Sequence, residues 1–161
     1  IGRPEAAMFL CDIGGGSTEV VIGSDDEEML ARSFKLGAVR LTDRFFASET
    51  LHPSAVGSCR TFARSTLMVI QPDIAELGYD IAVASSGTAE TVARIIHAQS
   101  GEPAPKTMNR FEFTRIQVSE TVKALAACTT VEERQKKLDA CTSHCDIEQA
   151  SLFFKLRERG C

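Results

Sequence analysis

Short apolar runs separated by polar turns open the chain. Residues 7–11 and 18–23 each predict a core strand, and a polar, glycine-rich segment lies between them. Residues 28–35 alternate apolar and polar side chains, which is typical of a strand with one solvated face. Three successive strands joined by short turns predict an antiparallel meander.

Helical periodicity takes over after the meander. Residues 38–46 predict one helix, and a stripe of apolar positions predicts a second over 54–70. Pro53 suits the first turn of that second helix because its fixed φ is already helical. Residues 71–73, which include a proline, are expected to end it.

A fully apolar run follows at 81–84, which predicts a short buried strand parallel to the first strand. The small polar residues 85–88 then predict a turn that opens a helix over 89–98. Simple capping of this helix by Ser86 or Thr88 is one explanation of these residues. An anion held at the helix N-terminus is the other.

The C-terminal part is expected to be helical. Thr114 is a candidate N-cap, and Thr130 with Glu133 three residues later forms a capping-box pattern. Asp146 is expected to cap a last helix that runs through Leu156. The predicted fold class is α/β, a single domain over residues 1–161 with a mixed sheet, an antiparallel meander and flanking helices.

The amino-acid composition limits the classes of function that the protein can have. The chain has 161 residues, 43% hydrophobic and 25% charged, with a formal net charge of −4, which is ordinary for a globular protein. This balance does not indicate a nucleic-acid-binding protein, and no apolar run approaches the length of a membrane span. The chain opens at Ile1 with no signal segment, so we expect a cytoplasmic protein of which this is one piece.

Six cysteines are compatible with reduced thiols in a cytosolic protein. Cys141, His144 and Cys145 lie close together in sequence, and Cys128 is a possible fourth metal ligand. Their spacing matches no standard zinc pattern. The sequence therefore favours ordinary thiols over a zinc site.

The segment Asp12-Ile-Gly-Gly-Gly-Ser-Thr-Glu19 carries the chemistry. Glycines at 14–16 permit positive φ and remove every Cβ, so successive amides are expected to converge on an anion. Ser17 and Thr18 add hydroxyl donors. Asp12 and Glu19 accept hydrogen bonds only, so they would repel a phosphate unless a cation lay between. The segment predicts a site for phosphate plus a divalent metal, Mg²⁺.

Other interpretations of this segment are weaker. A dinucleotide fingerprint requires a third glycine where Glu19 stands and a helix after it, whereas a P-loop requires a lysine. A plain hairpin turn needs one or two glycines and no flanking acids. The densest basic stretch near this segment consists of Arg32, Lys35, Arg40 and Arg44. A solvated face is the simplest explanation for Arg32 and Lys35, whereas Arg40 and Arg44, four residues apart, are expected to share a helix face.

Three segments together resemble the exopolyphosphatase and guanosine pentaphosphate phosphohydrolase family, within the sugar-kinase, heat-shock chaperone and actin superfamily. They are the glycine segment 12–19, the stretch Ser33-Phe-Lys-Leu-Gly-Ala-Val-Arg-Leu-Thr-Asp-Arg-Phe45, and the turn Ser85-Ser-Gly-Thr-Ala-Glu-Thr91. The resemblance implies a ribonuclease H-like lobe of the actin-like ATPase fold.

The resemblance also implies a function. Family members cleave terminal phosphoanhydrides of polyphosphate or of guanosine penta- and tetraphosphate with Mg²⁺. By this likeness Asp12 and Glu19 hold the metal and organise water. Gly14, Gly15, Gly16, Ser17 and Thr18 cradle phosphate, together with Gly87 and Thr88 of the second turn. The general base lies in a preceding lobe that these residues do not include.

Two further functions stay open at this point. A kinase or ATPase of the same superfamily uses a similar glycine loop, and a domain that senses nucleotide or polyphosphate would bind without turnover. The 33–45 stretch favours the hydrolase. A homodimer is compatible with the sequence, which does not determine the oligomeric state.

Overall fold

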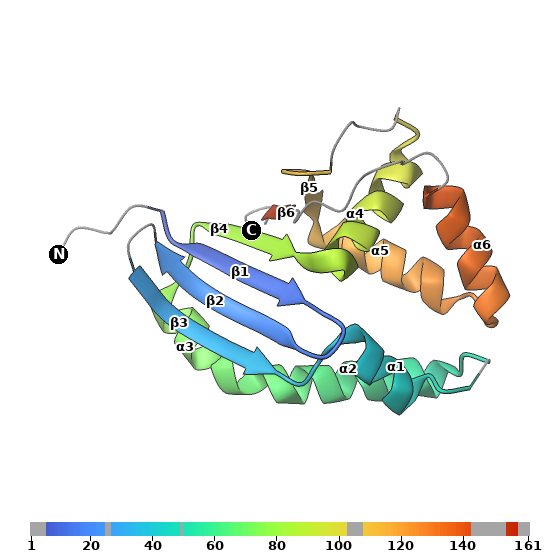
Figure 1. The fold of residues 1–161 in the computed structure, drawn as a ribbon, viewed down its shortest axis with the longest axis horizontal. Helices are drawn as coiled ribbons and strands as arrows, with labels where there is room; N and C mark the ends of the chain where they lie inside the picture. The colour runs from blue at the N-terminus through green and yellow to red at the C-terminus, as the bar shows by residue number, and fades with distance from the viewer. Residues whose placement is uncertain (1–5, 25–26, 49, 103–107, 143–153, 158–161) are drawn as a thin grey trace.

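One mixed sheet with flanking helices organises the molecule (Figure 1). The structure, a computed structural model, describes residues 6–24, 27–48, 50–102, 108–142 and 154–157. Within these residues, six strands pair in the order β3-β2-β1-β4-β6-β5. The predicted α/β class is therefore confirmed.

The first half of the sheet is an antiparallel meander. It consists of β1 (Met8–Ile13), β2 (Thr18–Ser24) and β3 (Glu27–Phe34). β2 is the central strand, and Thr18, Val20 and Ile22 along it are buried on one face. The meander confirms the prediction made from the alternation of apolar and polar residues.

β4 (Ile81–Ser85) extends the sheet on the other side of β1 and runs parallel to it. Its residues Ala82, Val83 and Ala84 are all buried. A strand covered on both faces needs apolar side chains at every position, which explains why the sequence shows an unbroken apolar run there.

A helical segment connects β3 to β4. It consists of α1 (Ala38–Phe45), α2 (Pro53–Leu67), the 3₁₀ turn η1 (Met68–Ile70) and α3 (Gln71–Leu77). The prediction that residues 71–73 end the helical run was wrong. Pro72 lies in the first turn of α3, where its missing amide costs nothing, and the run ends at Gly78, which has a φ of 66°.

The remaining helices and one strand follow β4. They are α4 (Ser86–Ser100), β5 (Glu112–Thr114), α5 (Arg115–Ala126) and α6 (Val131–Thr142). The predicted caps are confirmed: Thr114 forms a capping box with Gln117. Thr130 Oγ1 accepts from the Glu133 amide at 3.2 Å, while Glu133 Oε2 accepts from the Thr130 amide at 3.3 Å.

The end of the chain contradicts the sequence prediction. Leu156, expected in a last helix, belongs to β6 (Phe154–Arg157). It pairs with Ala82 of β4 and with Phe113 of β5. Backbone groups of two neighbouring strands outweigh local helical periodicity here, since they satisfy this segment from both sides. The predicted cap Asp146 lies outside the described residues.

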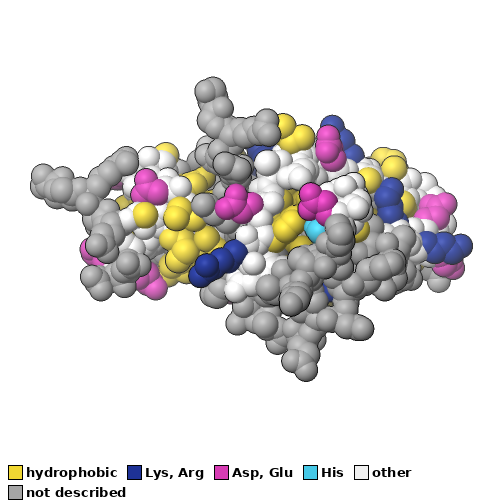
Figure 2. Space-filling model, turned by 90° about the horizontal axis from the view of Figure 1, so that it is seen from above, with side chains coloured by type: hydrophobic (Ala, Val, Ile, Leu, Met, Phe, Trp, Pro, Cys, Tyr) yellow, Lys and Arg dark blue, Asp and Glu magenta, His cyan; other side chains and the backbone are white. Residues whose placement is uncertain are grey.

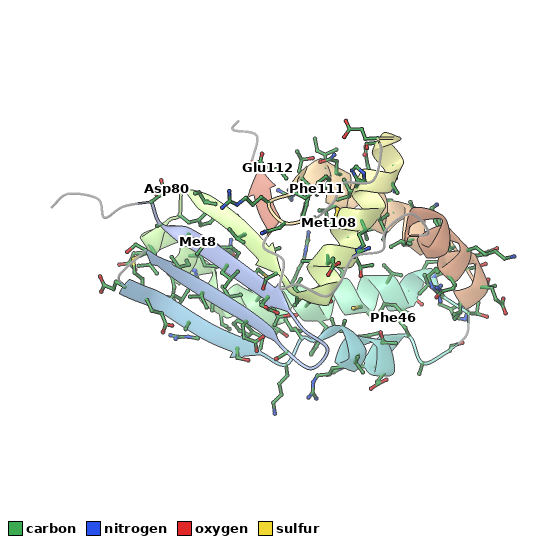
Figure 3. The ribbon with its side chains drawn as sticks, turned by 45° about the horizontal axis from the view of Figure 1, so that its top comes forward. Met8, Phe46, Asp80, Met108, Phe111 and Glu112 are labelled. Atoms are coloured by element: carbon green, nitrogen blue, oxygen red, sulfur yellow. The ribbon has the colours of Figure 1, made fainter. Side chains whose placement is uncertain are left out.

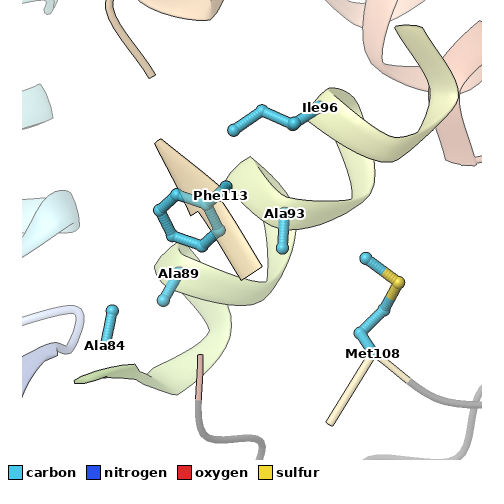
Figure 4. Close-up of a cluster of buried hydrophobic side chains, with 6 residues drawn as sticks. All are labelled: Ala84, Ala89, Ala93, Ile96, Met108 and Phe113. Atoms are coloured by element: carbon cyan, nitrogen blue, oxygen red, sulfur yellow. The ribbon is translucent and has the colours of Figure 1, made fainter. Parts of the chain in front are cut away.

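A hydrophobic cluster joins α4 to β4 and β5 (Figure 4). Ala84, Ala89 and Ala93 present small side chains, and Ile96, Met108 and Phe113 fill the space around them. Figure 3 shows Met108 and Phe111 beside α4. Alanines on the buried face let α4 lie close to the strands. This packing holds the first turn of α4 next to the end of β4.

The two ends of the sheet differ in character. At one end the Asp80 carboxylate accepts a hydrogen bond of 2.9 Å from the Ala7 amide, near Met8 (Figure 3). At the other end the turn between β1 and β2, the start of α1 and the start of α4 lie together, while α2 and α3 run below the sheet in this view (Figure 1). Within the described residues, no helix has the length and apolar content that crossing a membrane requires.

Candidate functional site

A row of four polar side chains crosses the sheet next to the glycine turn. The register pairs Glu19 of β2 with both Asp12 of β1 and Ser33 of β3, and it pairs Asp12 with Ser85 of β4. Residues directly opposite one another in neighbouring strands point to the same face. The order along the row is therefore hydroxyl, carboxylate, carboxylate, hydroxyl.

The outer hydroxyls orient the inner carboxylates. Ser33 Oγ donates to Glu19 Oε1 at 2.7 Å, and Ser85 Oγ donates to Asp12 Oδ2. Ser85 is buried, whereas Asp12 and Glu19 are half-buried. Each acid thus keeps oxygen lone pairs free for a further partner while its rotamer is fixed from one side.

The two acids need a cation between them. Opposite side chains in an antiparallel pair have Cβ atoms roughly 4.5–5.5 Å apart, and like charges at that separation repel. In the part of the chain that the structure describes, the ion pair is between Arg94 and Glu90, and neither acid of the row has a basic partner. Two carboxylates with hydroxyl neighbours are a donor set of hard oxygens, which fits Mg²⁺.

The number of ligands also fits Mg²⁺ better than zinc. Mg²⁺ is commonly held by one or two carboxylates, with waters and substrate phosphates completing its shell. Structural zinc needs four protein ligands, and no cluster of three or more His, Cys, Asp or Glu residues occurs among the described residues. The proposed cluster of Cys141, His144 and Cys145 lies outside the described side chains.

Hydrogen bonding lowers the pKa of Glu19. The hydroxyl of Ser17 is the larger cause and that of Ser33 the smaller, and both stabilise the carboxylate form. Glu19 therefore remains ionised to more acidic pH than an ordinary glutamate. That keeps it available as a metal ligand, and it makes Glu19 a weak proton acceptor at neutral pH.

The Cys11 thiol, which directly precedes Asp12 in the chain, is affected by burial and by the negative charge of the two acids. Burial, and then the charges of Asp12 and Glu19, raise the pKa of Cys11 to about 11. The thiol therefore stays protonated at neutral pH. Because the thiolate is the reactive form, Cys11 does not act as a nucleophile, although it directly precedes Asp12.

The glycine turn is built on α1. The amides of Ala38 and Val39, at the start of α1, donate to the carbonyls of Gly14 and Gly15 at 2.9 and 3.0 Å. The turn therefore satisfies helix amides that would otherwise lack partners. In return, α1 fixes the carbonyls of the turn on its own side.

The three glycines of the turn do not adopt the positive φ that the sequence predicted. Among the described glycines, positive φ occurs at Gly78 and Gly101 and at none of Gly14, Gly15 and Gly16. A Cβ on Gly15 would lie 3.4 Å from Val39 Cγ2, and one on Gly14 would lie 3.4 Å from the Ser17 carbonyl oxygen. Both distances are ordinary van der Waals contacts, and a Cβ on Gly16 would meet nothing within 4 Å.

Gly37 is the residue that sequence reasoning missed. A Cβ there would lie 2.2 Å from the carbonyl oxygen of Gly15 and 2.3 Å from the carbonyl carbons of Gly15 and Gly16. No side chain tolerates that distance to backbone. The signal was present as an isolated glycine directly before a predicted helix.

Thr18 does not point toward a ligand. Its side chain is buried, and Oγ1 donates to the Leu36 carbonyl at 3.2 Å. In the register it alternates with Glu19, so it faces the opposite side of the sheet. The structure thus contradicts a ligand-binding role for the Thr18 hydroxyl, which supports the turn from beneath.

The second turn meets the row at the start of α4. Ser85 is the N-cap but makes no capping hydrogen bond, because its hydroxyl donates to Asp12. Ser86, with a φ of 82°, donates from Oγ to the Ile13 carbonyl at 2.6 Å. Capping by Ser86 or Thr88, one of the two explanations that the sequence left open, is therefore not what the structure shows. Gly87 and Thr88 lie in the first turn, where the amides have no side-chain cap.

Figure 2 shows that acidic and basic side chains are interspersed on the upper face of the molecule. The basic side chains visible there do not form one continuous patch. This face therefore offers no broad positive surface to an anion.

Comparison with known proteins decides the family. The model of the Ppx/GppA phosphatase family matches residues 3–144. The chain belongs to the Ppx/GppA phosphatase family. Two curated relatives are a guanosine-5'-triphosphate,3'-diphosphate pyrophosphatase of Vibrio campbellii, 36% identical over 91 residues, and a putative exopolyphosphatase of Haemophilus influenzae, 35% identical over 95 residues.

The solved structures of the family agree with the fold. An exopolyphosphatase from Cytophaga hutchinsonii superposes with a TM-score of 0.68 at 20% identity, covering 95% of this chain and 54% of that one. The Aquifex aeolicus PPX-GPPA enzyme gives a TM-score of 0.68 at 25% identity, covering 83% and 42%. These likenesses confirm the predicted actin-like ATPase type of fold.

This Ppx/GppA chain matches part of each relative. The Vibrio campbellii alignment covers 56% of this chain and 18% of the relative, and the Haemophilus influenzae alignment covers 58% and 29%. The chain therefore spans less than a third of the length of either curated relative.

The approach of Gly37 to the turn gives a stability prediction. Gly37→Ala should lower the free energy of unfolding by about 3 kcal/mol, because its Cβ overlaps backbone that cannot move aside. Gly16→Ala is the matched control: its Cβ would meet nothing within 4 Å, so a change within about 0.5 kcal/mol is expected. Urea denaturation followed by circular dichroism measures the free energy of unfolding of both variants. Equal free energies would contradict the close approach of Gly37 to the turn.

The hydrogen bonds to Glu19 give a titration prediction. Ser17→Ala and Ser33→Ala should each raise the pKa of Glu19 toward its ordinary value, with the larger rise in Ser17→Ala. The lowered pKa favours the folded state above the pKa of the unfolded chain, and this contribution disappears as pH falls through the folded pKa. Carboxyl ¹³C NMR titration measures the shift. Ser58→Ala, on α2, serves as the control, and an unmoved Glu19 pKa in both test variants would exclude the predicted orientation.

Proposed function

We propose that the protein is a Mg²⁺-dependent phosphoanhydride hydrolase that removes terminal phosphate from polyphosphate or from guanosine penta- or tetraphosphate. The observation that carries this proposal is the hydroxyl–carboxylate–carboxylate–hydroxyl row beside the glycine turn. The names of the family's relatives point to the same chemistry, as a pyrophosphatase and a putative exopolyphosphatase.

Each part of the site has a role in this proposal. Asp12 and Glu19 hold Mg²⁺, with Ser85 and Ser33 positioning them. When bound, the ion supplies positive charge against the phosphate oxygens. The carboxylates take no part in accepting protons, because the lowered pKa of Glu19 and the metal both weaken a base.

Backbone amides supply the phosphate contacts. The amides of Gly15, Gly16 and Ser17 make no hydrogen bond with other described residues, so they remain available to an anion next to the metal. The first turn of α4, with Gly87 and Thr88, adds uncapped amides at the positive end of a helix. Gly14 differs, since its amide donates to the Ser17 carbonyl at 2.9 Å.

We further propose that residues 1–161 form one ribonuclease H-like domain, the C-terminal lobe of a two-lobed cytoplasmic enzyme. The shares of 54% and 42% that this chain covers in the solved family members support a second lobe in the complete protein. That lobe would supply the general base and close the cleft over the substrate. Homodimer formation is compatible with this arrangement.

Family membership favours hydrolysis over the alternatives. A kinase or ATPase of the same superfamily shares the glycine loop, but the family match extends over residues 3–144. A sensing domain would need no fixed metal site, whereas both carboxylates here are fixed by hydroxyl donors.

Asp12→Asn tests the metal site. In the complete protein this change should lower Mg²⁺-dependent phosphate release by at least about 100-fold, since metal stabilisation of the transition state amounts to several kcal/mol. The fold should survive because asparagine can still accept the Ser85 hydrogen bond. Asp73→Asn, in the first turn of α3, is the control. Wild-type release by the Asp12 variant would remove this residue from the site.

The chain by itself should not turn over substrate. Residues 1–161 are expected to release no phosphate from polyphosphate, ATP or guanosine pentaphosphate above background, because a general base must reach the attacking water within about 3 Å and the described acids nearest the turn hold metal. Malachite-green detection of phosphate measures this, with the complete protein as the positive control. Mg²⁺-dependent release by the fragment that is lost in Glu19→Gln would instead make Glu19 the base.

A further inference from the structure

A basic pocket opens on the glycine turn. It has a volume of about 920 Å³ and lies between the turn, α1 and α2. Gly15 and Gly16 form one wall, and Phe62 of α2 forms part of another. Three basic side chains line it: Lys35, Arg40 and Arg44.

Arg40 is held in the pocket by neutral groups. Its Nε donates to the Gly16 carbonyl at 3.1 Å, and its backbone amide donates to the Gly15 carbonyl at 3.3 Å. The guanidinium has five N–H donors, so most of them remain for another partner. A carbonyl fixes the group in place without neutralising its charge.

Arg44 is held by aromatic rings. Its guanidinium carbon lies 4.1 Å from the centre of the Phe62 ring and 5.4 Å from that of Phe45. Stacking of this kind orients the planar group and leaves its edge donors free. Both arginines are therefore positioned before any ligand arrives, which lowers the entropic cost of binding.

The pocket carries uncompensated positive charge. Asp43 is the acidic residue among its lining side chains. Within the described residues, neither Asp43 nor any of the three basic side chains forms an ion pair. All four charged side chains are exposed, and the three basic ones repel one another along this wall. A bound anion would relieve that repulsion.

We propose that Lys35, Arg40 and Arg44 form a second anion subsite, which binds an oligophosphate through its charge and without a metal. Gly15 and Gly16 line the pocket and belong to the turn that Asp12 and Glu19 flank, so a chain of phosphates long enough to pass around the turn would reach both. The identification of this oligophosphate as substrate rests on the proposed hydrolase function, whereas binding in the pocket does not. Arg32 lies outside the subsite, and its guanidinium donates to the Ala31 carbonyl at 2.9 Å.

Direct binding tests the subsite. Tripolyphosphate is titrated calorimetrically into the complete protein with EDTA present, so that metal-bound phosphate does not contribute. The double variant Lys35→Gln/Arg44→Gln should bind about tenfold more weakly, because it removes two charge-assisted contacts that are partly screened by solvent. Asp43→Asn should bind more tightly, since it removes the opposing charge. Circular dichroism confirms that each variant is folded.

Arg60→Gln is the matched control. Arg60 is an exposed residue of α2 outside the pocket lining. Its loss changes the net charge by one unit, as a single Arg44→Gln variant does, and should leave affinity unchanged. Equal weakening in Arg60→Gln and in a single Arg44→Gln variant would reduce the effect to general electrostatics and overturn the subsite. Wild-type affinity in the double variant, or no gain in Asp43→Asn, would overturn it as well.

Kinetics then separates the subsite from the hydrolase proposal and identifies the source of the phosphates. For a ligand that reaches the pocket, the double variant should raise KM about tenfold and leave kcat within about twofold, because uniform binding is lost. The KM is measured separately with long-chain polyphosphate and with guanosine pentaphosphate as substrate. The substrate whose KM rises is the one that binds in the pocket. An unchanged KM in both arms overturns its role in substrate binding. Absence of turnover in the wild-type protein would defeat the hydrolase proposal and leave the calorimetric result to decide the subsite.

Discussion

The contact between the glycine turn and the start of α1 is the constraint on which the site depends. Helix amides need acceptors, and the carbonyls of Gly14 and Gly15 supply them. This brings the two backbones so close that position 37 must be glycine. One contact therefore holds the turn, which Asp12 and Glu19 flank, against the helix that carries Arg40 and Arg44.

The pairing of two carboxylates across β1 and β2 is expected to destabilise the fold. Asp12 and Glu19 are direct neighbours across β1 and β2, where a pair of like charges is unfavourable. Hydroxyls from the outer strands offset part of this, and they favour the ionised form of Glu19. The divalent cation proposed for this site would relieve the repulsion, so metal binding and substrate binding are expected to be coupled.

In the proposed site, the metal and the arginines would contact different phosphates of one chain. A divalent ion acts at the phosphate that reacts, where charge develops. Preoriented guanidinium groups bind phosphates that do not react, and their contribution is to affinity. The glycine turn separates these two environments with backbone alone, which lets an extended anion pass close to both.

The sequence by itself determined the strands of the meander, the buried strand 81–84, the caps at Thr114 and Thr130, and the acidic glycine segment. These depend on local periodicity and on side chains a few residues apart. Tertiary structure decided the rest: the pairing of Ser33 and Ser85 with the acids, the clash at Gly37, the inward turn of Thr18 and the strand at Leu156. Each of these depends on backbone segments distant in sequence, whose register and approach no local pattern encodes.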